Sequence, residues 1–165
     1  MSQQDSLQHF GIPPDCDPKI AAVVRYWLSI KPDDGLPGRQ HIDPTDIPTL
    51  LHGVWLIDVR RDPLSFVFRL VGTSVVEFFG QDPTGRNLHD VFDDFERTVT
   101  YKDLCDIAET GTLRWRRGTP VLSHMPKFSR LERVYMPVAR NGKDVDMIFC
   151  FSVFGAENRT AGGAG

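Results

Sequence analysis

Two short apolar runs, joined by a turn, constrain the fold of this chain more than any other feature. The runs are 54-VWLIDVR-60 and 66-FVFRLVG-72, and the segment between them, 61-RDPLS-65, is rich in turn residues. The pattern predicts an antiparallel β-hairpin. Because nearly every position of both runs is apolar, we expect both faces of the sheet to be covered by other parts of the chain.

An amphipathic helix is predicted before this hairpin, over residues 18–30. Asp17 is a favourable N-cap residue, and Pro18 suits the first helical position because the missing N–H would have no partner there. Pro32 ends the run. The apolar residues that recur at helical spacing are Ile20, Val23, Val24, Trp27 and Leu28. We expect this helix to cover the outer face of the sheet or to bind a partner chain.

Helical and extended segments follow the hairpin in a definite order. Thr73 can cap a short helix that ends at Gly80, and a longer helix is predicted over roughly 94–109. Three strands are then predicted, near 112–122, 128–139 and 145–154. This order predicts an α+β fold, with a five-stranded antiparallel sheet, helices on one face and the additional N-terminal helix.

Length and charge narrow the functional classes. The 165 residues fit one domain over 18–154, with an extension over 1–17 and a small, polar tail over 155–165 that we expect to be disordered. The net charge of −3 gives no general attraction to nucleic acid or to anionic membranes, and no apolar run approaches the ~20 residues of a membrane span. The N-terminus lacks the features of a signal peptide, so we expect a cytoplasmic protein.

Glycines, cysteines and histidines give no sign of a phosphate or metal site. Gly72, Gly80 and Gly85 lack the spacing of a phosphate-binding loop, and we interpret them as turn and cap positions that allow positive φ. The three cysteines and five histidines are scattered without the spacing of metal ligands. We therefore expect no disulfide framework and no metal.

Four sequence features occur together in one known family. They are the Tyr26-Trp27 pair, 36-LPGRQHIDP-44, 54-VWLIDV-59 and 66-FVFRLVGTSVVEFFGQDPTGRNLHDVF-92, the last with a G-R-x-L step into the next helix. In this combination the chain resembles a PAS domain, a bacterial signalling and sensing module, and more closely a standalone bacterial subfamily. The resemblance implies a PAS fold with an interior pocket between the sheet and its helices. It also implies sensing or protein–protein regulation rather than catalysis.

A sensor of this kind would use a pocket and a contact surface. We expect a pocket for a small apolar ligand to be lined by Phe68, Phe79, Trp115, Tyr135 and Phe149. The resemblance implies that the first helix takes part in a homodimer, with Val23, Tyr26 and Trp27 as interface candidates. An intramolecular role for these three residues stays open. A signalling protein such as a histidine kinase would be the partner.

Neither haem nor flavin is expected as a cofactor. The sequence shows no histidine on a pocket wall with room for a macrocycle. Cys105 lies in 103-DLCDIA-108, which lacks the N-C-R-F-L-Q motif of flavin-binding PAS domains, and we interpret it as a buried thiol on a helix face.

Two alternative functions stay open. A pocket enzyme of isomerase-like or hydrolase-like type would need His124 to meet Asp58, Asp90 or Asp93 inside the pocket. An anion-binding sensor would instead use the basic residues of the later strands, which are Arg114, Arg116 and Arg130.

Overall fold

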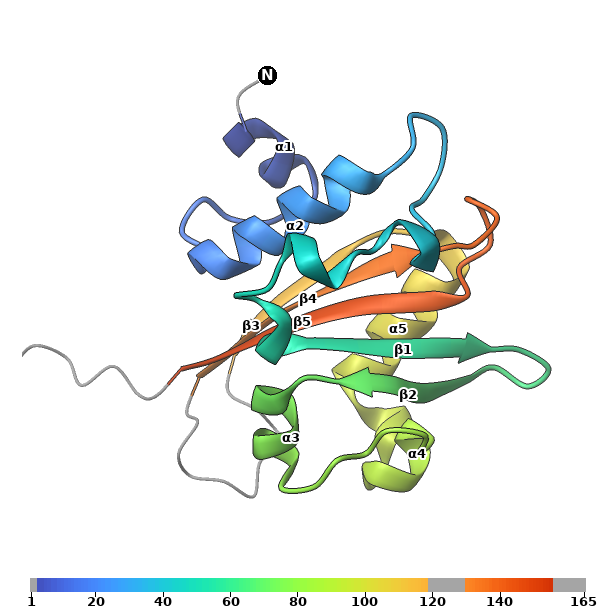
Figure 1. The fold of residues 1–165 in the computed structure, drawn as a ribbon. Helices are drawn as coiled ribbons and strands as arrows, with labels where there is room; N and C mark the ends of the chain where they lie inside the picture. The colour runs from blue at the N-terminus through green and yellow to red at the C-terminus, as the bar shows by residue number, and fades with distance from the viewer. Residues whose placement is uncertain (1–2, 119–129, 156–165) are drawn as a thin grey trace, which may run out of the picture.

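The computed structural model describes residues 3–118 and 130–155 and contains one five-stranded antiparallel sheet between two layers of helices (Figure 1). The strands are β1 Val54–Arg60, β2 Ser65–Val71, β3 Arg114–Gly118, β4 Arg130–Val138 and β5 Met147–Gly155. Their spatial order is β2-β1-β5-β4-β3, and every neighbouring pair is antiparallel. The main helices are α1 Gln3–His9, α2 Pro18–Ile30, α3 Thr73–Phe79, α4 Leu88–Val91 and α5 Val99–Thr110.

The N-terminal helices cover one face of the sheet. Asp17 caps α2, because its Oδ1 accepts a hydrogen bond of 2.8 Å from the Lys19 amide. Trp27 is buried, and its Nε1 donates to the Pro137 carbonyl oxygen of β4 at 2.9 Å. Leu7 and Ile12, from the 1–17 extension, are buried in the same apolar cluster. This confirms that the first helix covers the sheet, and the extension packs onto the layer that α2 forms.

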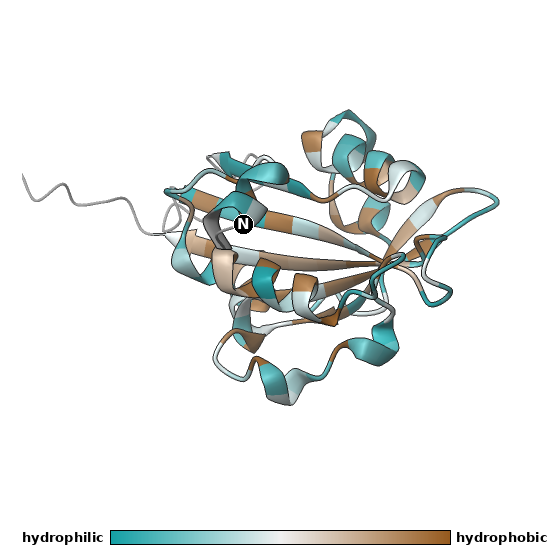
Figure 2. Ribbon diagram, turned by 90° about the horizontal axis from the view of Figure 1, so that it is seen from above, coloured by the Kyte–Doolittle hydropathy of each residue, from teal (hydrophilic) through white to brown (hydrophobic). Residues whose placement is uncertain are grey.

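The other face carries α3, α4 and α5 (Figure 1). The amphipathic α5 buries Leu104 and Ile107 against the sheet. Consecutive strand residues point to opposite faces, so each central strand contributes apolar side chains to both layers. The strands are accordingly mostly brown in Figure 2, which is coloured by hydropathy. The expectation from the hairpin, that both faces are covered, is confirmed.

The helix boundaries differ from the sequence prediction in two places. The helix expected over 94–109 is interrupted, because Asp94 has a left-handed φ of 51° and a short 3₁₀ turn, η4 Phe95–Arg97, follows it. Thr98 then caps α5, since its Oγ1 accepts a 3.0 Å hydrogen bond from the Tyr101 amide. The additional short helix α4 begins after Asn87, whose Oδ1 accepts from the His89 amide.

The start of α3 corrects two further expectations. Thr73 is the first residue of α3 rather than its cap, and Gly72 occupies the cap position. Gly72 has a φ of −68°, so positive φ does not explain this glycine. An added Cβ would instead lie 2.5 Å from the carbonyl oxygens of Leu51 and His52. Gly80 and Gly85 do have positive φ, as expected for cap and turn glycines.

The strand ends also shift slightly. β3 begins at Arg114 and β5 begins at Met147, each two residues later than predicted. The predicted strand residues 119–122 and 128–129, and the tail over 156–165, lie outside the described residues. Over the described parts of the chain, no helix combines the length and the hydrophobicity that a bilayer crossing requires.

Candidate functional site

A cavity of about 490 Å³ lies between the sheet and the α3–α5 layer. Its size is within the range of small-molecule sites. The helical side of the cavity comes from α3 and from the segment 92–100, and the sheet side comes from β1, β4 and β5. The residues that line it are Trp55, Val75, Phe78, Phe79, Phe92, Asp93, Asp94, Arg97, Thr98, Val99, Thr100, Leu131, Arg133, Tyr135, Ser152 and Phe154.

Six of the sixteen lining residues are aromatic. The rings of Phe79 and Phe92 meet edge to face, with centroids 5.4 Å apart, and the Phe78 and Phe154 rings are stacked at 4.6 Å. Trp55 meets Tyr135 edge to face at 5.8 Å on the sheet side. Such a surface favours a ligand with an apolar body, because binding removes apolar surface of both partners from water.

Polar groups line both sides of the cavity, and those on the sheet side are hydrogen-bonded to one another. The Trp55 Nε1 donates to Ser152 Oγ at 2.9 Å, so both of these buried polar side chains are paired. The Arg133 Nε donates to the Tyr135 hydroxyl oxygen at 2.8 Å. Burial raises the pKa of Tyr135, although the nearby Arg133 guanidinium acts in the opposite direction. Tyr135 therefore presents a neutral hydroxyl at physiological pH.

The five predicted pocket residues lie on both faces of the sheet rather than on one. Phe79 and Tyr135 line the cavity, and Phe68 lies just behind the wall, with its ring 5.8 Å from that of Phe79. Trp115 and Phe149 lie on the opposite face, in the cluster with α2. Side chains alternate along a strand, so an error of one residue in the predicted facing moves a side chain to the other face. On β5 the cavity residues are Ser152 and Phe154.

The predicted basic patch is also divided between faces. Arg116 reaches α5, where its Nε and Nη2 donate to the buried Asp103 carboxylate at 2.8 and 2.7 Å, and these hydrogen bonds raise the pKa of Arg116. Arg114 lies 3.9 Å from the Asp106 carboxylate of the same helix. Arg130 is exposed, and its position on β4 places it on the α2 face. The three arginines therefore do not form one patch.

Two of the three interface candidates are core residues of the single chain. Val23 and Trp27 are buried against the sheet by α2. Tyr26 is half-buried, and its hydroxyl oxygen accepts a 2.8 Å hydrogen bond from the Asp43 amide. The intramolecular role left open by the sequence accounts for these contacts, and a partner surface on this helix stays a prediction.

The residues of the enzyme alternative do not converge in the described structure. Asp93 lines the cavity, but Asp58 lies on the other face of β1, 3.9 Å from the Arg69 guanidinium. Asp90 is exposed on α4, and His124 lies outside the described residues. Within the described ranges, no three or more His, Cys, Asp and Glu side chains are grouped in a way that could hold a metal ion.

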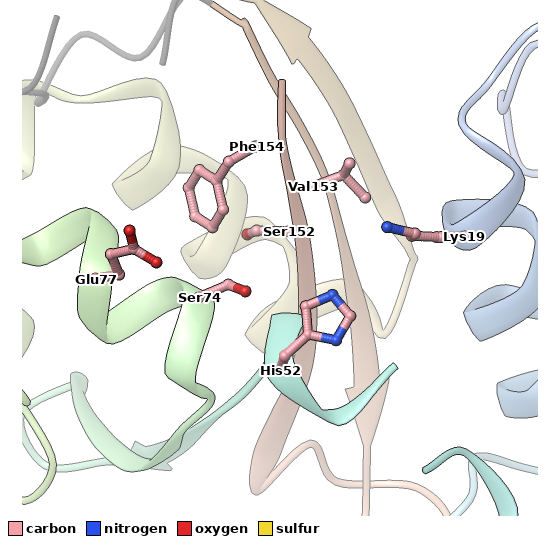
Figure 3. Close-up of a pocket in the computed structure, with 7 residues that line it drawn as sticks. All are labelled: Lys19, His52, Ser74, Glu77, Ser152, Val153 and Phe154. Atoms are coloured by element: carbon pink, nitrogen blue, oxygen red, sulfur yellow. The ribbon is translucent and has the colours of Figure 1, made fainter. Parts of the chain in front are cut away.

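A second, smaller hollow lies beside the cavity, near the end of β5 (Figure 3). Its volume is about 120 Å³, which is below the range of small-molecule sites. It is lined by Lys19, His52, Ser74, Glu77, Ser152, Val153 and Phe154. Figure 3 shows Phe154 and Ser152 beside this hollow, and both residues also line the larger cavity. The larger cavity is therefore the candidate site.

Three comparisons with known proteins bear on the family of this chain. A family model described as "PAS domain" matches residues 17–126. A solved structure, described as an RNA-binding light-oxygen-voltage receptor, aligns with a TM-score of 0.42 at 18% identity, over 75% of this chain and 37% of that chain. The chain thus spans little more than a third of the length of that receptor. A comparison with curated proteins finds no match.

Proposed function

The chain belongs to the PAS domain family of sensor and regulatory modules, and from this premise we propose that it is a non-catalytic sensor that binds a small, mainly apolar molecule. The signal would pass to another protein, such as a histidine kinase, through direct contact. One observation carries the proposal: a cavity of about 490 Å³ with aromatic walls lies between the sheet and the α3–α5 layer. Burial of an apolar ligand there would contribute roughly 25 cal/mol per Å² of apolar surface removed from water.

The strand β4 supports a route from this cavity to the N-terminal layer. Arg133 lines the cavity, while the preceding residue, Glu132, points to the other face and is buried. The Glu132 carboxylate accepts hydrogen bonds from the Asp17 amide at 2.9 Å, from Trp115 Nε1 at 3.2 Å and from Arg117 Nε at 3.3 Å. The start of α2 is therefore attached to the strand that forms the cavity floor. A ligand that displaced β4 would move the N-terminal layer, which we propose as the contact surface for a second copy or a partner.

Native mass spectrometry of the purified protein tests both parts of the proposal. We expect a bound small molecule that survives transfer and a main species at twice the 18.7 kDa chain mass. A fluorescence titration with N-phenyl-1-naphthylamine, a neutral apolar dye, tests the cavity directly. Val75 is buried and lines the cavity, so Val75→Phe should fill it and weaken dye binding.

Val76→Phe is the matched control, because Val76 lies on the same helix but does not line the cavity. This variant should bind the dye like the unmodified protein. A purified protein that carries no small molecule and does not bind the dye would rule out the ligand part of the proposal. A monomeric species at all concentrations would rule out the homodimer and leave contact with a different protein.

A further inference from the structure

We propose that the ligand of this cavity carries a carboxylate and that the Arg133 guanidinium binds it. This inference rests on the proposed function, because it specifies the chemistry of the molecule that the sensor detects. The apolar body of the ligand would lie along Phe78, Phe79 and Phe92, and its carboxylate would face β4. A fatty acid of medium chain length or an arylalkanoic acid has this combination of groups.

Arg133 lines the cavity and has no anionic partner among the described residues. Its Nε donates to the Tyr135 hydroxyl, and among the described residues no carboxylate lies within 4.0 Å of its guanidinium. The three arginines of β3 differ in this respect. Arg114, Arg116 and Arg117 each lie within ion-pairing distance of at least one Asp or Glu. Arg133 is thus a half-buried cation without a counter-ion in the described structure.

A like charge lies next to Arg133 in the sheet. Arg116 on β3 stands directly opposite Arg133 on β4 in the antiparallel register, and both side chains point to the cavity face. Like charges at directly opposite positions are destabilising. Asp103 balances the charge of Arg116, but the charge of Arg133 is not balanced in the same way. A bound anion would supply the missing negative charge.

The cavity composition favours a carboxylate over other anions. A guanidinium group offers donors in a planar fork that matches the two oxygens of a carboxylate. A phosphate ester would bring more charge and more oxygen atoms than one arginine can satisfy, and most of the remaining cavity wall is aromatic or aliphatic. A single carboxylate on an apolar body fits this composition best.

The other cavity arginine, Arg97, has a different environment. It belongs to the segment that also places Asp93 and Asp94 at the cavity, so this side carries more negative than positive charge. An anion would be repelled there and attracted at Arg133 on the sheet side. This difference fixes the orientation of the ligand, with its carboxylate on the sheet side.

Matched pairs of probes test the inference by isothermal titration calorimetry on the full chain. The pairs are decanoic acid with decanamide, and naphthalene-1-acetic acid with naphthalene-1-acetamide. Each amide keeps the shape of its acid and removes the charge. We expect at least one acid to bind about tenfold to a hundredfold more tightly than its amide, as a charge-assisted hydrogen bond predicts.

Substitutions assign the effect to Arg133. Arg133→Gln should lower the affinity for the acid to that of the amide, and Arg133→Lys should have an intermediate effect because lysine lacks the planar fork. Arg130→Gln removes the same charge from the same strand on the opposite face and should change neither affinity. Without ligand, Arg133→Gln should melt at the same temperature as the unmodified protein or higher, because the repulsion from Arg116 is removed.

Each contrary result has a distinct meaning. Equal binding of acid and amide, or retention of the acid preference in Arg133→Gln, would overturn the carboxylate assignment and leave an apolar sensor. Failure of every probe to bind would overturn it together with the ligand part of the proposed function. If Arg133→Gln does not fold, the acid-to-amide ratio of the unmodified protein and the Arg133→Lys variant still decide the question.

Discussion

The two faces of the sheet are covered by helices but are filled to different degrees. On the α2 face, Trp27, Phe149 and Phe151 are buried and pack together with aliphatic side chains of β4. On the α3–α5 face, half-buried rings such as Phe79 and Phe92 surround a cavity of about 490 Å³. Apolar strands are therefore covered on both faces, whereas the shape of the covering elements decides whether a space remains.

The helix α3, which lines the cavity, is much shorter than α2. α2 has 13 residues, with a continuous apolar stripe that lies along the sheet. α3 has seven residues and α4 has four, and the chain between them turns at Gly80 and Gly85. Short helices joined by turns cannot present one continuous stripe, so their aromatic side chains form the walls of a hollow. The polar residues Arg133 and Ser152 also occupy strand positions on this face, where they line the cavity.

The same substitution on each face gives the largest expected contrast. Phe149→Ala removes a fully buried ring from the α2 face and should lower the free energy of unfolding by about 3–5 kcal/mol. Phe92→Ala removes a half-buried ring beside an existing cavity and should cost only about 1 kcal/mol. Urea denaturation of both variants measures the difference. Equal losses would show that the two faces are packed equally well.

On the α3–α5 face, a polar contact adds stability where close packing is incomplete. Asp103 of α5 is 1% exposed and binds Arg116 through two hydrogen bonds. Asp103→Asn should lower the free energy of unfolding by about 2 kcal/mol, because a charged acceptor is lost while Arg116 keeps access to water. Denaturation at neutral pH tests this value. A change below about 0.5 kcal/mol would mean that α5 is held by its apolar residues alone.

Loss of a single hydrogen bond on the α2 face should have a smaller effect on the free energy of unfolding. Trp27→Phe keeps a large ring but removes the donor to the Pro137 carbonyl oxygen. We expect a loss of about 1–2 kcal/mol in the free energy of unfolding, since a buried carbonyl would be left without its partner. Trp27→Ala serves as the reference for complete removal of the side chain and should cost clearly more. A neutral result for Trp27→Phe would assign the role of Trp27 to packing only.

Alkaline pH should weaken the fold through residues on the cavity face. Burial raises the pKa of Cys150 well above its usual value of 9.0, so the thiol ionises in the unfolded chain before it ionises in the folded one. Stability should therefore be constant below about pH 9 and fall by about 1.4 kcal/mol per pH unit above it. Tyr135, opposite Cys150 in the sheet, should add to the loss above pH 10, because its pKa is also raised.

The Cys150→Ala variant isolates this contribution. Its free energy of unfolding, measured in urea between pH 7 and pH 10, should decline less steeply than that of the unmodified protein. The same slope for both proteins would show that other groups, such as the buried Cys16 on the α2 face, account for the alkaline loss.

The sequence predicts most of the fold because its strongest signals are local. The hairpin over 54–72, the Asp17–Pro18 helix start and the Gly80 helix end each depend on neighbouring residues, and the structure confirms all three. The sequence does not predict the break at Asp94, because a left-handed aspartate has no strong sequence signature. Local sequence patterns therefore predict those structural elements that interactions between neighbouring residues determine.

The candidate site is less accessible to this reasoning. Nearly uniform apolar strands hide which residues face the cavity, and this placed Phe149 and Trp115 on the wrong side. Arg133 is one of several basic residues in this part of the sequence. The pairing of β3 with β4 places Arg116 opposite Arg133. Asp103 forms an ion pair with Arg116, whereas Arg133 has no ion pair among the described residues. The alternation of Leu131, Arg133 and Tyr135 could have indicated one common face.

Gly72 has a consequence for how the chain tolerates mutation. Its backbone passes so close to the carbonyl oxygens of Leu51 and His52 that any Cβ would force one of the two segments to move. In a saturation scan that selects for folded protein, we expect that position 72 does not tolerate even alanine, just as a packed core position does not tolerate a larger side chain. Gly80, where an added Cβ meets no atom within 4 Å, should accept Asn, which tolerates its left-handed conformation. Two glycines eight residues apart would thus differ in the substitutions that they tolerate. The distance to neighbouring carbonyl oxygens limits Gly72, and the positive φ limits Gly80.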